Sequence, residues 1–338
     1  MEGEKGTVCV TGGTGYIGSW LILRLLDHGY SVTTTVRSNP EIINIDIENV
    51  TAEHKKDLSF LTSLPGASER LKIFDADLNN PESFRAAIEG CIGVFHVATP
   101  IDFENEEAEE IVTKRSIYGA TGILQACLDS KTVKKVVYTS SAAAVVFNGK
   151  DFDQMDESFW SDIDYVKSLE SNSGSYAISK TLTERAVLEF SEKHGLEVVT
   201  LIPTFVVGPF ICPKLPSSVR SVFNLILGEK SASSSLTRID TVHVDDVASA
   251  HIFLFENRET KGRYNCSANT IEVESISKLL STKYSVLEIP SKGSQVKMEA
   301  NSPSLSSKKL LDSGFQFKHG VEEMFDDAIK CCKEKAYL

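Results

Sequence analysis

Short apolar, β-branched runs alternate with longer stretches of helical apolar spacing through roughly the first 200 residues. The apolar runs cover residues 8–10, 31–36, 71–74, 94–97, 136–139 and 198–202. The helical stretches begin near Tyr16, Pro81, Glu106 and Ser175. Strands that alternate with helices in this way predict an α/β fold, a doubly wound parallel sheet with helices on both faces.

The alternation fades after Pro203, where residues 212–218 and 231–235 have a loop-like composition. We expect the chain to return to the sheet near residues 241–244. The expected organisation is a Rossmann domain of residues 1–203 plus about 239–258, and an irregular C-terminal substrate lobe of residues 204–238 and 259–338. Residues 41–50, between the second and third runs, are interpreted as a surface insertion.

The 338 residues carry a net charge of -12, which argues against nucleic acid or an anionic membrane as the main partner. No apolar run reaches the length of a membrane span. The seven cysteines lack the spacing of metal ligands or of paired disulfides, which indicates a reducing compartment and no metal site. The charged residues 1–6 lead directly into the first strand without room for a targeting segment, so we expect a cytoplasmic protein. We also expect a monomer or weak homodimer.

A glycine-rich segment, residues 11–18, joins the first strand to the first helix. Gly12 permits the sharp turn, Gly15 lets a pyrophosphate approach the backbone, and Gly18 lets the helix lie close to the strand. The helix N-terminus then offers free N–H groups to phosphates. This order of strand, glycine turn and helix predicts a dinucleotide site.

The end of the second strand indicates which dinucleotide binds. An NAD site usually has an acidic residue at this point, whereas this strand ends at Val36 and is followed by Arg37. A guanidinium binds a phosphate through charge-assisted hydrogen bonds, so NADP(H) fits better than NAD. Lys55 and Lys56 are expected to assist from beyond the insertion.

The candidate chemistry lies on a later helix and on the strand before it. Tyr176 and Lys180 are four residues apart and therefore share a helix face. An ammonium near a tyrosine favours the phenolate and lowers the tyrosine pKa from about 10, which suits acid–base catalysis. Ser140 and Ser141 end the fifth strand, and from the residues alone either serine is a candidate to support a substrate carbonyl.

These motifs resemble those of the extended short-chain dehydrogenases/reductases, within them the plant dihydroflavonol 4-reductase family, and most closely its vestitone reductase branch. Segments that match the family are spread over nearly the whole chain: residues 11–18, 34–37, 75–78, 93–100, 138–142, 176–180, 202–204, 242–246, 262–266 and 315–318.

The resemblance implies Ser141, Tyr176 and Lys180 as the catalytic residues. It also places Asp77 and Leu78 at the adenine, residues 97–99 along the adenosine and pyrophosphate, and residues 203–206 near the nicotinamide. With the residues argued above, the expected cofactor set is Gly12, Thr14, Gly15, Tyr16, Ile17, Arg37, Lys56, Asp77, Leu78, Val97, Ala98, Thr99, Thr139, Tyr176, Lys180, Pro203, Thr204, Val206 and Ser218.

The implied activity is hydride transfer from NADPH to a ketone carbonyl, with the substrate at Ser141, Val146 and Tyr176. The family often has an asparagine where this chain has Val146, and a bulky aromatic in the stretch 171–175, which this chain lacks. An apolar side chain cannot form the asparagine's hydrogen bond to a flavonoid hydroxyl. We therefore expect another hydrophobic ketone, such as an isoflavonoid or an alkaloid.

Three alternatives remain open. A cinnamoyl-CoA reductase would carry Asn-Trp-Tyr-Cys-Tyr-Gly-Lys around the catalytic pair, whereas residues 174–180 read Gly-Ser-Tyr-Ala-Ile-Ser-Lys. A nucleotide-sugar epimerase or dehydratase would need basic groups for a diphosphate, for which Arg220, Arg238 and Arg263 are candidates. A non-catalytic NADP(H)-binding protein would typically lose the Tyr/Lys pair, which is intact.

Overall fold

The computed structural model describes residues 5–37, 57–100, 108–150, 152–169, 174–227, 237–284 and 304–338. The expected insertion at residues 41–50 and Lys56 lie outside the described residues, as do residues 171–173.

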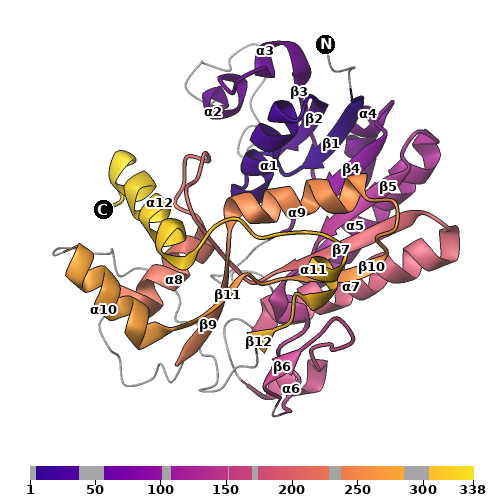
Figure 1. Ribbon diagram of the computed structural model, residues 1–338. Helices are drawn as coiled ribbons and strands as arrows, with labels where there is room; N and C mark the ends of the chain where they lie inside the picture. Colours follow the sequence, from indigo (N-terminus) through magenta and orange to yellow (C-terminus); the bar gives the residue numbers. More distant parts are fainter. Residues whose placement is uncertain are drawn as a thin grey trace.

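A seven-stranded parallel sheet forms the centre of the molecule, with the strand order β10-β7-β5-β4-β1-β2-β3 (Figure 1). Six of its strands match the six apolar runs: β1 (Thr7–Thr11), β2 (Ser31–Val36), β3 (Leu71–Asp75), β4 (Gly93–His96), β5 (Lys135–Thr139) and β7 (Glu197–Pro203). The order reverses between β1 and β4, and ligands of such sheets bind beyond the strand ends at that point. The predicted doubly wound Rossmann-type fold is confirmed.

Helices cover both faces of the sheet because successive side chains of each strand point to opposite faces. Val8 and Val10 pack with α1 (Tyr16–Asp27) and α9 (Val244–Glu256), whereas Cys9 packs with α5 (Glu109–Ser130) on the other face. α7 (Gly174–His194) lies beside α5. Shorter helical elements in this part are α2 (Ser59–Thr62), α3 (Ala67–Arg70), η4 (Pro81–Phe84), α4 (Arg85–Ile88), η5 (Ala142–Ala144) and α6 (Ile163–Ser168).

A second lobe adjoins the sheet around α8 (Ser217–Leu227), α10 (Val273–Lys283) and α12 (Val321–Glu334), which share one apolar cluster (Figure 1). A three-stranded sheet in the order β11-β9-β8 supports it. Its strands are β8 (Phe205–Val207), β9 (Arg238–His243) and β11 (Asn269–Glu272). The remaining elements are β6 (Gln154–Met155), β12 (Ser304–Leu305) and α11 (Lys308–Asp312).

The expected return of the chain to the main sheet at residues 241–244 is wrong. That run ends β9, which pairs with β8 and β11, and the seventh strand of the main sheet is instead β10 (Gly262–Cys266), beside β7. Apolar alternation identifies a strand but not the sheet that it joins. The division at residue 258 therefore misplaces β10, which belongs with the Rossmann sheet.

Candidate active site

A cavity of about 1160 Å³ opens beyond the carboxyl ends of the central strands and extends to the second lobe. The glycine loop and the ends of β2 and β3 line one end of it, and residues 212–218 line the other. The cofactor, catalytic and substrate residues predicted from the sequence all line this cavity except Lys55 and Lys56, which lie outside the described residues. The structure thus brings together residues spread from Gly12 to Ser218.

The glycine loop approaches neighbouring backbone so closely that side chains are excluded. Gly12 has a φ of +76°, and a Cβ there would lie 3.0 Å from the Cα of Ala98. A Cβ at Gly18 would overlap the Gly12 carbonyl. The first turn of α1 has no side-chain cap at Gly15, so its N–H groups remain available to a phosphate.

Arg37 directly follows β2 and lines the same end of the cavity. It is exposed and forms no ion pair within the described part of the chain. Thr35, two residues earlier, accepts hydrogen bonds from the backbone N–H groups of Gly12 and Gly13 at 3.3 and 3.0 Å. The strand end is therefore tied to the glycine loop, and an unpaired cation beside a phosphate cradle fits the 2′-phosphate of NADP(H).

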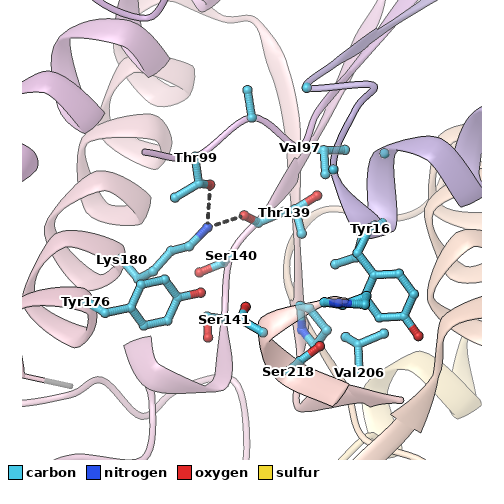
Figure 2. Close-up of a pocket in the computed structure, with 18 of the residues that line it drawn as sticks. Tyr16, Val97, Thr99, Thr139, Ser140, Ser141, Tyr176, Lys180, Val206 and Ser218 are labelled. Carbon is cyan, nitrogen blue, oxygen red and sulfur yellow. Dashed lines mark hydrogen bonds between the residues drawn. The ribbon is translucent and has the colours of Figure 1, made fainter. Parts of the chain in front are cut away.

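α7 presents Tyr176 and Lys180 to the cavity on one face (Figure 2). The Lys180 ammonium donates hydrogen bonds to Thr99 Oγ1 at 2.8 Å and to the Thr139 carbonyl at 3.0 Å. It lies 5.9 Å from the centroid of the Tyr176 ring. Lys180 is therefore held between the ends of β4 and β5, beside the tyrosine.

The two serines at the end of β5 have different partners. Ser140 is buried and donates a hydrogen bond to Glu184 Oε2 at 2.7 Å. Ser141 begins η5, accepts a hydrogen bond from the backbone N–H of Ala143 and is hydrogen-bonded to Tyr176. Ser141 is therefore the serine beside the tyrosine hydroxyl, which agrees with the expectation from the family (Figure 2).

The titration of the pair differs from the sequence-based interpretation. Burial raises the pKa of Tyr176 above its usual value, and the hydrogen bond with Ser141 opposes that rise. The expected lowering of the Tyr176 pKa by Lys180 does not outweigh the effect of burial. Burial lowers the pKa of Lys180 to about 8, against the opposing charge of Glu184. A protonated phenol beside a cation suits the delivery of a proton.

The other end of the cavity carries residues that the sequence did not single out. Phe147 and Leu215 add apolar side chains to the cavity lining, to which Val146 also belongs. Asp240 accepts hydrogen bonds from Thr270 Oγ1 at 2.6 Å and from the Leu305 N–H at 2.7 Å. Asp240, Thr270 and Leu305 lie in β9, β11 and β12, so no local sequence motif identifies them as neighbours.

A match to a family model accompanies this geometry. Residues 8–267 match the NAD dependent epimerase/dehydratase family, and the chain belongs to that family. Its fold and site define an NADP(H)-dependent oxidoreductase of the short-chain dehydrogenase/reductase type.

Within this class, the chain is 56% identical to vestitone reductase of Medicago sativa, over 100% of both chains. It is 42% identical to dihydroflavonol 4-reductase of Callistephus chinensis, over 100% of this chain and 89% of the relative. The crystal structure of vestitone reductase from alfalfa (Medicago sativa) superposes with a TM-score of 0.83 at 53% identity, covering 99% of this chain and 100% of that one. The predicted resemblance is confirmed.

Proposed function

We propose that this protein reduces the ketone carbonyl of a hydrophobic plant secondary metabolite to an alcohol with NADPH. The observation that carries the proposal is the meeting of Ser141, Tyr176 and Lys180 at one wall of a large cavity. The similarity to vestitone reductase over the full chain supports a ketone substrate. The apolar side chains of Val146, Phe147 and Leu215 support a hydrophobic one.

NADPH, when bound, supplies the hydride. Tyr176 donates the proton to the alkoxide oxygen as it develops, and its raised pKa keeps the phenol protonated at neutral pH. Ser141 donates a hydrogen bond to the same oxygen, which stabilises its growing negative charge. Lys180, fixed by Thr99 and Thr139, adds a positive charge beside the phenol, and it would hold the nicotinamide ribose.

We assign cofactor binding to the residues expected from the sequence. The glycine loop (Gly12, Thr14, Gly15, Tyr16, Ile17) would hold the pyrophosphate and Arg37 the 2′-phosphate. Asp77 and Leu78 would contact the adenine, Val97 to Thr99 the adenosine and pyrophosphate, and Thr139, Pro203, Thr204, Val206 and Ser218 the nicotinamide half. The support is that all of them line one cavity.

We further propose a cytoplasmic protein that acts as a monomer or weak homodimer, with the substrate bound by the second lobe. The seven cysteines are all free and buried, which agrees with a reducing compartment. In the described part of the chain no helix is both long and apolar enough to cross a membrane. Size-exclusion chromatography with light scattering, at two protein concentrations, tests the oligomeric state.

The proposal is tested by NADPH oxidation with vestitone, a dihydroflavonol and a benzylisoquinoline-type ketone, and with cinnamoyl-CoA as a competing class. Conversion of a UDP-sugar, which consumes no NADPH, is followed by product analysis. We expect turnover of at least one ketone and its loss in Tyr176→Phe, with NADPH binding retained. Tyr118→Phe, at an exposed tyrosine on α5, is the matched control. Near-normal turnover by Tyr176→Phe, or turnover confined to the CoA ester or the nucleotide sugar, would refute the proposal.

The nucleotide-sugar alternative loses one of its three candidate cations. Arg263 is buried, and its guanidinium pairs with Glu184 at 2.8 Å, so it is not available to a diphosphate. Of the three arginines, only Arg238 lines the cavity as the structure describes it. A single exposed arginine is a weak diphosphate site.

A further inference from the structure

Helix α7 contacts the end of β5 through three of its residues, each four positions after the last. Tyr176 is hydrogen-bonded to Ser141, Lys180 to the Thr139 carbonyl, and Glu184 to Ser140. Three consecutive residues, the last of β5 and the two that follow it, thus engage three residues of one helix face. The first two helix residues belong to the proposed catalytic site, whereas Glu184 lies outside it and is fully buried.

Glu184 is the centre of a saturated polar network. Its Oε1 accepts hydrogen bonds from Thr200 Oγ1 at 2.7 Å and from Arg263 Nε at 2.8 Å. Its Oε2 accepts from Ser140 Oγ at 2.7 Å and from Arg263 Nη2 at 3.2 Å. One carboxylate therefore joins α7 to the strands β5, β7 and β10.

Arg263 is itself held on its remaining sides. Its Nη1 donates to the carbonyls of Glu157 and Phe159 at 2.7 and 2.6 Å. Its guanidinium lies 3.6 Å from the centroid of the Trp160 ring. Removal of one partner of a buried ion pair leaves the other uncompensated, so this network resists movement of α7 relative to the sheet.

The network also places a negative charge on the turn of α7 that follows Lys180. The other groups around the Lys180 ammonium are the Tyr176 phenol, the Tyr138 ring of β5 at 5.6 Å, and His96 of β4, which burial and Lys180 keep neutral. Arg263 offsets part of the Glu184 charge. Among these groups Glu184 is the anion, and its charge favours the ammonium form of Lys180.

We propose that Glu184 is a positioning residue of this enzyme: through Ser140, Thr200 and Arg263 it fixes α7 against the sheet, and it sets a negative charge one helical turn from Lys180. The inference rests on the proposed reductase function. It predicts two separable effects of substitution, a lower kcat and a shift of the pH profile.

The test compares Glu184→Gln with Glu189→Gln, which makes the same change at an exposed residue of the same helix. The pH profile of kcat is measured with vestitone, or with the best ketone of the screen. In Glu184→Gln we expect kcat to fall while the KM for NADPH stays within about twofold. We also expect the loss of activity at high pH to move about 0.5 to 1 unit lower, because the ammonium loses its nearby anion.

Two further variants separate charge from folding damage. Glu184→Gln/Arg263→Gln removes both buried charges, and we expect the pH shift to be smaller than in the single variant. Ser140→Ala removes one hydrogen bond without a charge, and we expect a lower kcat with an unshifted profile. Thermal unfolding of each variant shows whether it is folded at the assay temperature.

A readout independent of turnover is the NMR titration of Lys180 in protein labelled with ε-¹³C lysine, assigned with Lys180→Arg. An unchanged Lys180 midpoint in Glu184→Gln, or the same shift in Glu189→Gln, would overturn the inference. An unchanged kcat in Ser140→Ala would overturn its positioning half. Absence of ketone turnover in the unmodified protein would instead refute the proposed function, and the two failures are therefore distinguishable.

Discussion

Replacement of Arg37 by aspartate should reverse much of the preference for NADPH over NADH. The guanidinium lines the end of the cavity beside the glycine loop and forms no ion pair with described residues, so the substitution disrupts no ion pair in the described part of the chain. Thr35 still ties the end of β2 to the glycine loop. The expected effect is therefore on the 2′-phosphate and not on folding.

The magnitude follows from the exposure of Arg37. A hydrogen bond to a charged partner contributes about 1.5 to 3 kcal/mol, and an exposed side chain belongs at the lower end of that range. About 1.5 kcal/mol corresponds to a tenfold higher KM for NADPH. Repulsion between the new carboxylate and the phosphate adds a further factor of about 3, and hydrogen bonds from the ribose hydroxyls of NADH to Asp improve NADH by a similar factor.

The ratio of kcat/KM for NADPH to that for NADH should thus fall about 100-fold, as measured by steady-state oxidation of each cofactor with a fixed ketone. Arg37→Gln should show the loss with NADPH but not the gain with NADH. Arg258→Asp makes the same charge change at an exposed arginine outside the cavity and should leave the ratio unchanged. An unchanged preference in Arg37→Asp would refute the assignment of Arg37 to the 2′-phosphate.

Two further outcomes follow from the cavity wall and the core. Val146→Asn should raise kcat/KM for dihydroquercetin about 2- to 10-fold through one new hydrogen bond. It should also lower Tm, because Val146 packs against the apolar cluster that contains Leu305. An unchanged ratio of kcat/KM for dihydroquercetin to that for vestitone would contradict the assignment of Val146 to the substrate. Burial lowers the pKa of His96 to about 3 and of His243 and His251 to about 4, so below pH 6.5 the unfolded chain binds more protons than the folded one. Stability should therefore decrease as the pH falls from about 6.5 to about 4, by up to about 1.4 kcal/mol per unit for each histidine, in urea unfolding at several pH values. His251→Gln should flatten that slope, and an equal slope would contradict the account.

Much of the fold could be predicted because its signals are local. Five of the six predicted strands are buried over most of their length, whereas β3 is partly exposed, and the glycine loop carries its own geometric requirement at Gly12 and Gly18. β10 lacks an apolar run of this kind, so its sequence did not predict a strand of the main sheet. Two of its five residues, Arg263 and Asn265, are polar yet buried, and their partners come from distant segments such as Glu184 and Glu157. A polar residue that is buried by a distant partner cannot be identified from its neighbours in sequence.

The candidate site likewise combines residues that a local pattern predicts with residues that only the fold brings together. The spacing of four residues predicts that Tyr176 and Lys180 share a helix face, and the same spacing places Glu184 one turn further along that face. Asp240 and Thr270 carried no comparable signal, because the pairing of β9 with β11 brings them together. The sequence therefore predicted the glycine-loop end of the cavity and the Tyr176 and Lys180 face better than the wall formed by β9, β11 and β12.

The polar residues on the buried face of α7 limit which substitutions the enzyme should accept. Its buried face includes Lys180, Thr181 and Glu184 besides apolar residues, so part of its packing depends on satisfied polar groups. A buried polar group stabilises a structure only when its partners are present, whereas an apolar contact tolerates small rearrangements. Substrate specificity in this enzyme should therefore change readily at Val146 and the second lobe. The face of α7 should accept few substitutions, because each one disturbs both the position of the helix and the charge at the proton donor.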